Sequence, residues 1–118
     1  MTVGAIIQIF GTNKCRETRA AQRFFKERRI AFHFVDLDEK ELSAGEFESV
    51  KRAVGLENMI DREGKEFQKQ QLQYQVFDIE AALKRNQKLL KTPIVREGRK
   101  ATAGYQPEAW QLWLQGMA

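Results

Sequence analysis

The stretch AIIQIFGTNKCRETRAAQRFFKERRIAFHFVDLD, residues 5–38, decides the fold of this chain. It opens with a short apolar run rich in β-branched residues, which predicts a buried strand over 5–10. Apolar side chains then recur at helical spacing opposite charged ones, so we expect an amphipathic helix over 16–29. A second apolar run predicts another strand over 31–38. A strand, a helix and a strand in this order form a βαβ unit with a right-handed crossover.

The rest of the sequence predicts helices, then a hairpin, then a last helix. Ser43 and Glu46 have the spacing of a capping box at the start of a helix. The polar segment 56–90 has no strand signal and carries a further helical pattern. Two short strands joined by a turn are predicted over 92–105, TPIVREGRKATAGY. Pro107 then opens a helix with two tryptophans on its apolar face.

These elements assign the chain to the α/β class. The order β-α-β, helices, β-β-α is satisfied most simply by two layers with a mixed sheet, which is the thioredoxin plan with helices inserted between its halves. No repeat, linker or low-complexity tract divides the 118 residues. We therefore expect a single thioredoxin-like domain over 1–118, with a helical insert over roughly 40–90.

The composition indicates a folded protein of a reducing compartment. Hydrophobic residues make up 42% of the chain and charged residues 31%, and no apolar run is long enough to span a bilayer. The first residues lack the basic region and the cleavage site of a signal peptide. A single cysteine cannot form an internal disulfide. We therefore expect a cytoplasmic protein that does not associate with membranes.

The net charge of +4 raises the question of nucleic-acid binding. Most basic residues are interleaved with acidic ones, as in FKERR and DREGKEFQK, which is typical of a solvated surface. The sequence contains no RNP, zinc-finger or helix-turn-helix signature and no cluster of metal ligands. We therefore expect neither direct nucleic-acid binding nor a bound metal.

Cys15 lies where a thiol can react. The predicted strand and helix place it at a helix N-terminus, where unpaired N–H groups and the helix dipole favour an anion. Lys14, Arg16 and Arg19 add positive charge, and Thr18 lies one turn further on, where it could donate its hydroxyl to a thiolate. The thiolate is the nucleophilic form of cysteine. The alternative is a small buried side chain, which is the commoner role of a single cysteine.

Two segments resemble the glutaredoxin-dependent arsenate reductase family, which includes the transcriptional regulator Spx. They are FGTNKCRETRAAQRFFKERRIAFHFVDL near the start and LLKTPIVREGRKATAGYQPEAW near the end. The resemblance covers nearly the whole chain in order and spacing, and it implies a thioredoxin-like fold with an inserted helical subdomain. It places Cys15 at the nucleophile of the family, and Thr18 and Arg19 at the Ser-Arg pair that follows it. Pro93 falls at the cis-proline beside the nucleophile, so we expect a cis bond before it.

The resemblance also implies a reaction scheme. In reductases of this type the thiolate attacks arsenate, glutathione attacks the arsenylated cysteine, and glutaredoxin reduces the mixed disulfide. It thus implies an oxyanion or disulfide substrate, no bound cofactor, and glutathione or glutaredoxin as the external reductant. Three arginines usually hold the oxyanion, but Thr92 and Gln106 stand at two of these places, and Arg62 matches the third after a one-residue insertion. We expect Arg16, Arg62, Thr92 and Pro93 at the substrate site.

Two functions are compatible with these observations. The first is a thiol oxidoreductase in which an external thiol releases Cys15, because the chain has no CxxC motif. The second is an Spx-like binding module that docks on the α subunit of RNA polymerase, or on another protein, without redox catalysis. The AGY stretch over 103–105 is closer to the Spx-like branch, whereas the missing CxxC motif argues against a dithiol switch.

Overall fold

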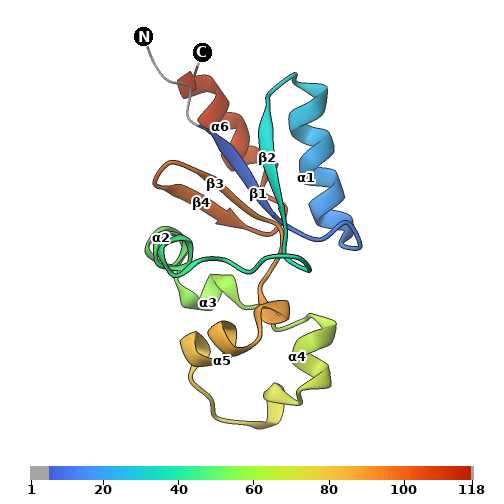
Figure 1. Cartoon of the computed structure of the whole chain (residues 1–118), viewed down its shortest axis with the longest axis vertical. Helices are drawn as coiled ribbons and strands as arrows, with labels where there is room; N and C mark the ends of the chain where they lie inside the picture. Colours follow the sequence, from blue (N-terminus) through green and yellow to red (C-terminus); the bar gives the residue numbers. More distant parts are fainter. Residues whose placement is uncertain (1–5, 118) are drawn as a thin grey trace.

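A four-stranded mixed sheet forms the centre of the computed structural model, which describes residues 6–117. Its strands are β1 (Ile7–Gly11), β2 (Phe32–Asp36), β3 (Ile94–Glu97) and β4 (Lys100–Ala103). Their order across the sheet is β2-β1-β3-β4 (Figure 1), with β1 and β2 parallel and the other neighbours antiparallel. The mixed sheet and the expected order of elements are confirmed. Residue 5 of the first predicted strand lies outside the described residues.

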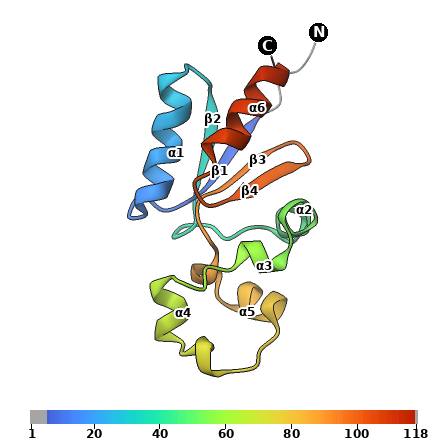
Figure 2. The same ribbon diagram turned by 180° about the vertical axis from the view of Figure 1, so that it is seen from behind.

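Helices α1 (Arg16–Glu27) and α6 (Pro107–Met117) cover one face of the sheet (Figure 2). Alternate residues of the central strands, such as Ile9 and Val95, point to this face, as the two-residue period of a strand requires. They pack with the apolar stripe of α1 and with Trp110, which is fully buried. This confirms the predicted apolar face of the last helix.

Helix α2 (Ala44–Val54) covers the opposite face, where it packs beside β4. It begins with the predicted capping box. The hydroxyl of Ser43 accepts a hydrogen bond from the backbone N–H of Glu46 at 3.1 Å, and the Glu46 carboxylate accepts one from the backbone N–H of Ser43 at 2.8 Å. Two of the otherwise unpaired N–H groups at this helix end are satisfied in this way.

Short helices follow α2 and form the lower part of the molecule in Figure 1. They are α3 (Leu56–Met59), α4 (Lys65–Lys69), η1 (Leu72–Tyr74), α5 (Ile79–Arg85) and η2 (Gln87–Leu89). Their buried side chains belong to the same apolar cluster as those of α2, so one core continues from the sheet into this region. The molecule is elongated, measuring 49 × 26 × 25 Å. Within residues 6–117, no helix has both the length and the apolar character that crossing a membrane requires.

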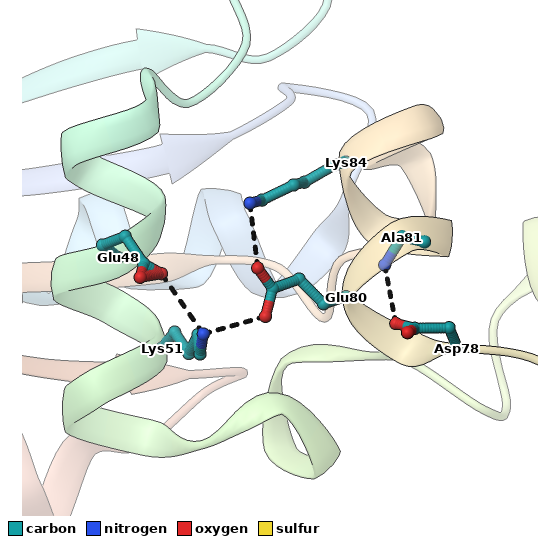
Figure 3. A network of polar contacts seen from close by, with 6 residues as sticks. All are labelled: Glu48, Lys51, Asp78, Glu80, Ala81 and Lys84. Atoms are coloured by element: carbon teal, nitrogen blue, oxygen red, sulfur yellow. Dashed lines mark hydrogen bonds and ion pairs between the residues drawn. The ribbon is translucent and has the colours of Figure 1, made fainter.

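An ion-pair network joins α5 to α2 (Figure 3). Glu80 accepts hydrogen bonds from Lys51 of α2 at 2.8 Å and from Lys84 of its own helix at 2.9 Å. Lys51 also lies 3.4 Å from Glu48. The bonds from Lys51 and Lys84 lower the pKa of Glu80 to about 2, and the bond to Glu80 raises the pKa of Lys51. The network therefore ties the short helices to the face of the sheet that α2 covers.

Candidate functional site

The loop between β1 and α1 places Cys15 at the N-cap of α1. The backbone N–H of Cys15 donates to the carbonyl of Thr12 at 3.1 Å, and its carbonyl accepts the N–H of Arg19 at 3.1 Å. The side chain is half-buried and makes no cap hydrogen bond to the helix. Cys15 is therefore at the predicted helix terminus, with its thiol turned to other partners.

Two side chains contact the thiol. The hydroxyl of Thr92 donates to Cys15 Sγ at 3.2 Å, and the thiol lies 3.6 Å from Oε1 of Glu17, to which it can donate. Thr92 comes from the segment just before β3, and its bond to the buried Pro93 is cis, as predicted. The fold thus brings a hydroxyl and a carboxylate to the only sulfur that can act as a nucleophile.

Cys15 and Thr92 open onto a cavity of about 740 Å³. Five carboxylates line it, from Glu17, Asp38, Glu41, Asp61 and Glu66. Four cations line it as well, from Lys14, Lys65, Arg85 and Lys88. The lining therefore carries no excess of basic residues, although the chain as a whole has 20 basic and 16 acidic residues.

Part of the cavity lining comes from the short helices α4, α5 and η2. Hydrogen bonds from Asn86 at 2.6 Å and from Gln70 at 3.0 Å hold the pKa of Glu66 below its usual value, so this carboxylate stays charged at neutral pH. None of the four cations forms an ion pair within the described part of the chain. Their charges are available to a molecule that enters the cavity.

The structure shows where the predicted site residues Arg16, Thr18 and Arg19 lie relative to the thiol. Arg19 donates to the carbonyl of Asn13 at 2.7 Å, so it braces the loop before Cys15. Arg16 is exposed and does not line the cavity. Thr18 is fully buried, and its hydroxyl has no hydrogen-bond partner within residues 6–117. The prediction that Thr18 donates a hydrogen bond to the thiolate is therefore wrong, because the side chain of Thr18 points into the core.

Arg62 also lies away from the thiol. Its guanidinium pairs with Glu57 at 3.1 Å and lies 5.8 Å from the ring centroid of Phe67 and 5.9 Å from that of Phe77. It does not line the cavity. The structure thus brings Thr92 to Cys15 but not Arg62, whose charge is satisfied on the short helices.

Sequence reasoning missed two groups of cavity residues. Glu17 was visible as the second residue after Cys15, and its place in the first helical turn could have indicated that it lies beside the thiol. Lys65, Arg85 and Lys88 reach the cavity only because the short helices fold beneath the sheet. The described residues contain no group of three or more His, Cys, Asp or Glu side chains that could hold a metal ion.

Comparisons with known proteins agree with this architecture. The family model described as "ArsC family" matches residues 10–112. Among solved structures, the YffB (PA3664) protein superposes with a TM-score of 0.78 at 18% identity, covering 95% of this chain and 99% of the other. An arsenate reductase from Vibrio cholerae has a TM-score of 0.74 at 19% identity, covering 98% and 99%.

A glutaredoxin from Archaeoglobus fulgidus matches more distantly, with a TM-score of 0.50 at 19% identity, covering 95% of this chain and 88% of the other. These structural likenesses concern the fold, and they confirm the thioredoxin-like architecture expected from the sequence. No curated protein is significantly similar to the chain in sequence.

Proposed function

The chain belongs to the ArsC family, and on this premise we propose that it is a thiol-dependent oxidoreductase with Cys15 as the nucleophile. One observation carries most of the argument. The half-buried Sγ receives a hydrogen bond from the hydroxyl of Thr92 at 3.2 Å and borders a cavity large enough for a small substrate. A hydroxyl that donates to sulfur stabilises the thiolate, which is the attacking form.

In the proposed reaction the Cys15 thiolate attacks one sulfur of a disulfide, so that a new S–S bond forms while the other sulfur leaves as a thiolate, or it attacks the central atom of an oxyanion, which loses one oxygen as water. In the oxyanion case an external thiol next attacks the Cys15 sulfur, and the electron pair of the broken bond passes to the central atom, which is reduced by two electrons and leaves a mixed disulfide on Cys15. An external thiol such as glutathione then attacks the mixed disulfide and releases Cys15 as a thiolate. An external thiol is required because the chain has a single cysteine, and glutaredoxin is the second candidate for this role. Such thiols are abundant in a reducing compartment, so we propose a cytoplasmic location.

The other residues near the thiol act on its surroundings in this proposal. Arg19 is a positioning residue, because its bond to Asn13 holds the loop that ends at Cys15. Thr18 supports the same loop from below by packing in the core. Thr92 contacts the reacting sulfur, so it is the residue whose change should alter the chemistry most directly.

The test measures turnover of hydroxyethyl disulfide and of arsenate, with glutathione and glutaredoxin as reductants. We expect turnover of at least one of these two substrates by the wild type and of neither by Cys15→Ser. Thr92→Val keeps the size of the side chain but removes the donor. A hydrogen bond to a charged group contributes about 1.5 kcal/mol, which corresponds to about tenfold in the rate of attack, and the higher intrinsic nucleophilicity of a less stabilised thiolate offsets part of this loss. The expected net decrease in the rate of attack is about fourfold. Turnover that persists in Cys15→Ser, or no turnover of either substrate by the wild type, contradicts the proposal.

A binding role is the second candidate, and one surface feature favours it. Tyr74, the last residue of η1, is 82% exposed, and Val76, in the segment between η1 and α5, is fully exposed. Exposed aromatic and aliphatic side chains are typical of contact surfaces. Titration with purified RNA polymerase α subunit tests this role. Binding that survives Cys15→Ser and is lost in Tyr74→Ser would support docking, whereas no binding would leave the enzyme as the better assignment.

A further inference from the structure

Glu17 places a carboxylate beside the nucleophile. Its carboxylate oxygen lies 3.6 Å from Cys15 Sγ, on the first turn of the same helix. Glu17 is exposed and forms no ion pair within residues 6–117, so no cation cancels its charge in this region. A negative charge therefore stands beside the sulfur, in the lining of the cavity onto which the thiol opens.

The nearby arginines do not compensate for this charge. Arg19 is engaged with the carbonyl of Asn13, and Arg16 does not line the cavity. The other side chain that contacts Sγ is that of Thr92, which offers a neutral hydroxyl. Carboxylates also outnumber cations in the cavity lining as a whole, by five to four. Lys14 lines the cavity too, but within residues 6–117 Glu17 is the charged side chain that contacts Sγ itself.

We propose that Glu17 determines the substrate class by rejecting negative charge at the attacked atom, so that the substrate is a disulfide with neutral or cationic groups beside its sulfurs. This inference rests on the proposed function and narrows it. An oxyanion carries its negative oxygens on the atom that must bond to Sγ, which brings them against the Glu17 carboxylate. The sulfurs of a disulfide are uncharged, so attack on them avoids this repulsion.

The step itself is thiol–disulfide exchange. The Cys15 thiolate supplies the electron pair for the new bond to one sulfur, the substrate S–S bond breaks, and the second sulfur leaves as a thiolate. An external thiolate then attacks the mixed disulfide and returns Cys15 to its starting state. Anions at the far end of the substrate are tolerated, because Lys65, Arg85 and Lys88 line the cavity beyond the thiol. The selection by Glu17 thus concerns only the groups within a few bonds of the attacked sulfur.

The test compares three small disulfides of similar length at fixed neutral pH and low salt: cationic cystamine, neutral hydroxyethyl disulfide and anionic dithiodipropionate. Mass spectrometry follows the formation of the Cys15 mixed disulfide for each one. The rates with the charged disulfides are divided by the rate with the neutral one. These ratios cancel every effect of a substitution that is the same for all three disulfides. They report only the charge that the substrate meets.

Two unit charges about 6 Å apart in water interact strongly enough to change a rate roughly threefold. In Glu17→Gln we therefore expect the anionic-to-neutral ratio to rise about threefold and the cationic-to-neutral ratio to fall about threefold. Glu27→Gln is the matched control, because it removes an equally exposed carboxylate at the other end of α1. It should leave both ratios unchanged. High salt should reduce the difference between the wild type and Glu17→Gln, since exposed charges are screened.

The possible outcomes distinguish the role of Glu17 in substrate selection from the proposed oxidoreductase function on which it rests. Ratios that shift in Glu17→Gln and not in Glu27→Gln support the role of Glu17. Reaction with all three disulfides at ratios that Glu17→Gln leaves unchanged overturns that role but keeps the oxidoreductase. A shift of the same size in Glu27→Gln also overturns it, because net charge would then explain the effect. If no disulfide forms an adduct with Cys15 in either protein while the wild type turns over arsenate, the inference fails and the oxidoreductase remains; if arsenate does not react either, both fail.

Discussion

Replacing Gly11 by alanine tests how the loop that carries Cys15 is held. Gly11 ends β1 and lies against the buried Thr18 of α1. A Cβ at residue 11 would stand 2.8 Å from Cγ2 of Thr18 and closer still to its hydroxyl, which is tighter than real side-chain contacts. Overpacking of this kind in a core costs about 1–3 kcal/mol. We expect Gly11→Ala to lower the free energy of unfolding by about 2 kcal/mol, which corresponds to a fall in Tm of roughly 8 °C for a domain of this size.

The partner of the clash can be removed independently. Thr18→Ala deletes a buried methyl group, which costs about 0.8 kcal/mol, and improves helix propensity by about 0.5 kcal/mol. It also removes a buried hydroxyl that has no partner within residues 6–117, which should return about 1 kcal/mol. Thr18→Ala alone should therefore stay within about 1 kcal/mol of the wild type. In that background Gly11→Ala keeps only the 3.1 Å contact with the Cβ of residue 18, so it should cost much less, giving a coupling energy of up to about 2 kcal/mol.

Thr18→Val is the matched control, because it keeps the bulk at Thr18 while removing the hydroxyl. Gly11→Ala should remain costly in that background. Urea unfolding followed by tryptophan fluorescence gives all the free energies, since Trp110 and Trp113 lie in the core. If Gly11→Ala were as stable as the wild type, or if Thr18→Val rescued it as well as Thr18→Ala, the packing argument would be refuted.

Two further predictions concern the network and the core. Hydrogen bonds from Lys51 and Lys84 lower the pKa of Glu80 from its ordinary value of 4.5 to about 2. The ion pairs of Glu80 therefore stabilise the fold fully above about pH 4.5, and their contribution is lost as the pH falls from about 4.5 to about 2. Glu80→Gln should therefore lower the urea midpoint at neutral pH and approach the wild type near pH 2; parallel curves over the whole range would contradict the assignment. Trp110→Ala should cost about 3–5 kcal/mol, because the side chain is fully buried. Trp110→Phe loses the 2.8 Å bond to Thr102 and part of the ring and should cost less; circular dichroism measures both, and equal losses would be inconsistent with this account.

The strands of the sheet and the helices that flank it were predictable, because the sequence patterns that mark them are local. The βαβ unit follows from two apolar runs around an amphipathic helix, and the capping box at Ser43 marks the start of α2 within the sequence itself. The predicted cis bond before Pro93 came from resemblance to a family, since X-Pro bonds are mostly trans. The strand, helix and capping patterns, in contrast, can be recognised without any knowledge of distant contacts.

The site was less predictable because it is assembled from distant segments. The pairing of Thr92 with Cys15 spans 77 residues, and no periodicity reveals which side chain will meet the thiol. The error at Thr18 has a clear cause: a side chain three residues along a helix lies one turn away, but here that direction points into the core beside Gly11. Helical spacing fixes a face of the helix, and only the packing of that face against the sheet decides what it touches.

The pairing of β1 with β3 also bears on how the protein is made. These central neighbours come from near the two ends of the chain, since Ile7 pairs with Glu97 and Phe10 with Ile94. Contacts between such remote segments form slowly, because a long loop must close first. During synthesis, Cys15 emerges from the ribosome well before Thr92 and β3 have been made. Until they arrive, the nascent chain displays a thiol without its hydroxyl partner and an unpaired edge of β1, and this is the stage at which adventitious oxidation or strand pairing with another chain would do the most harm.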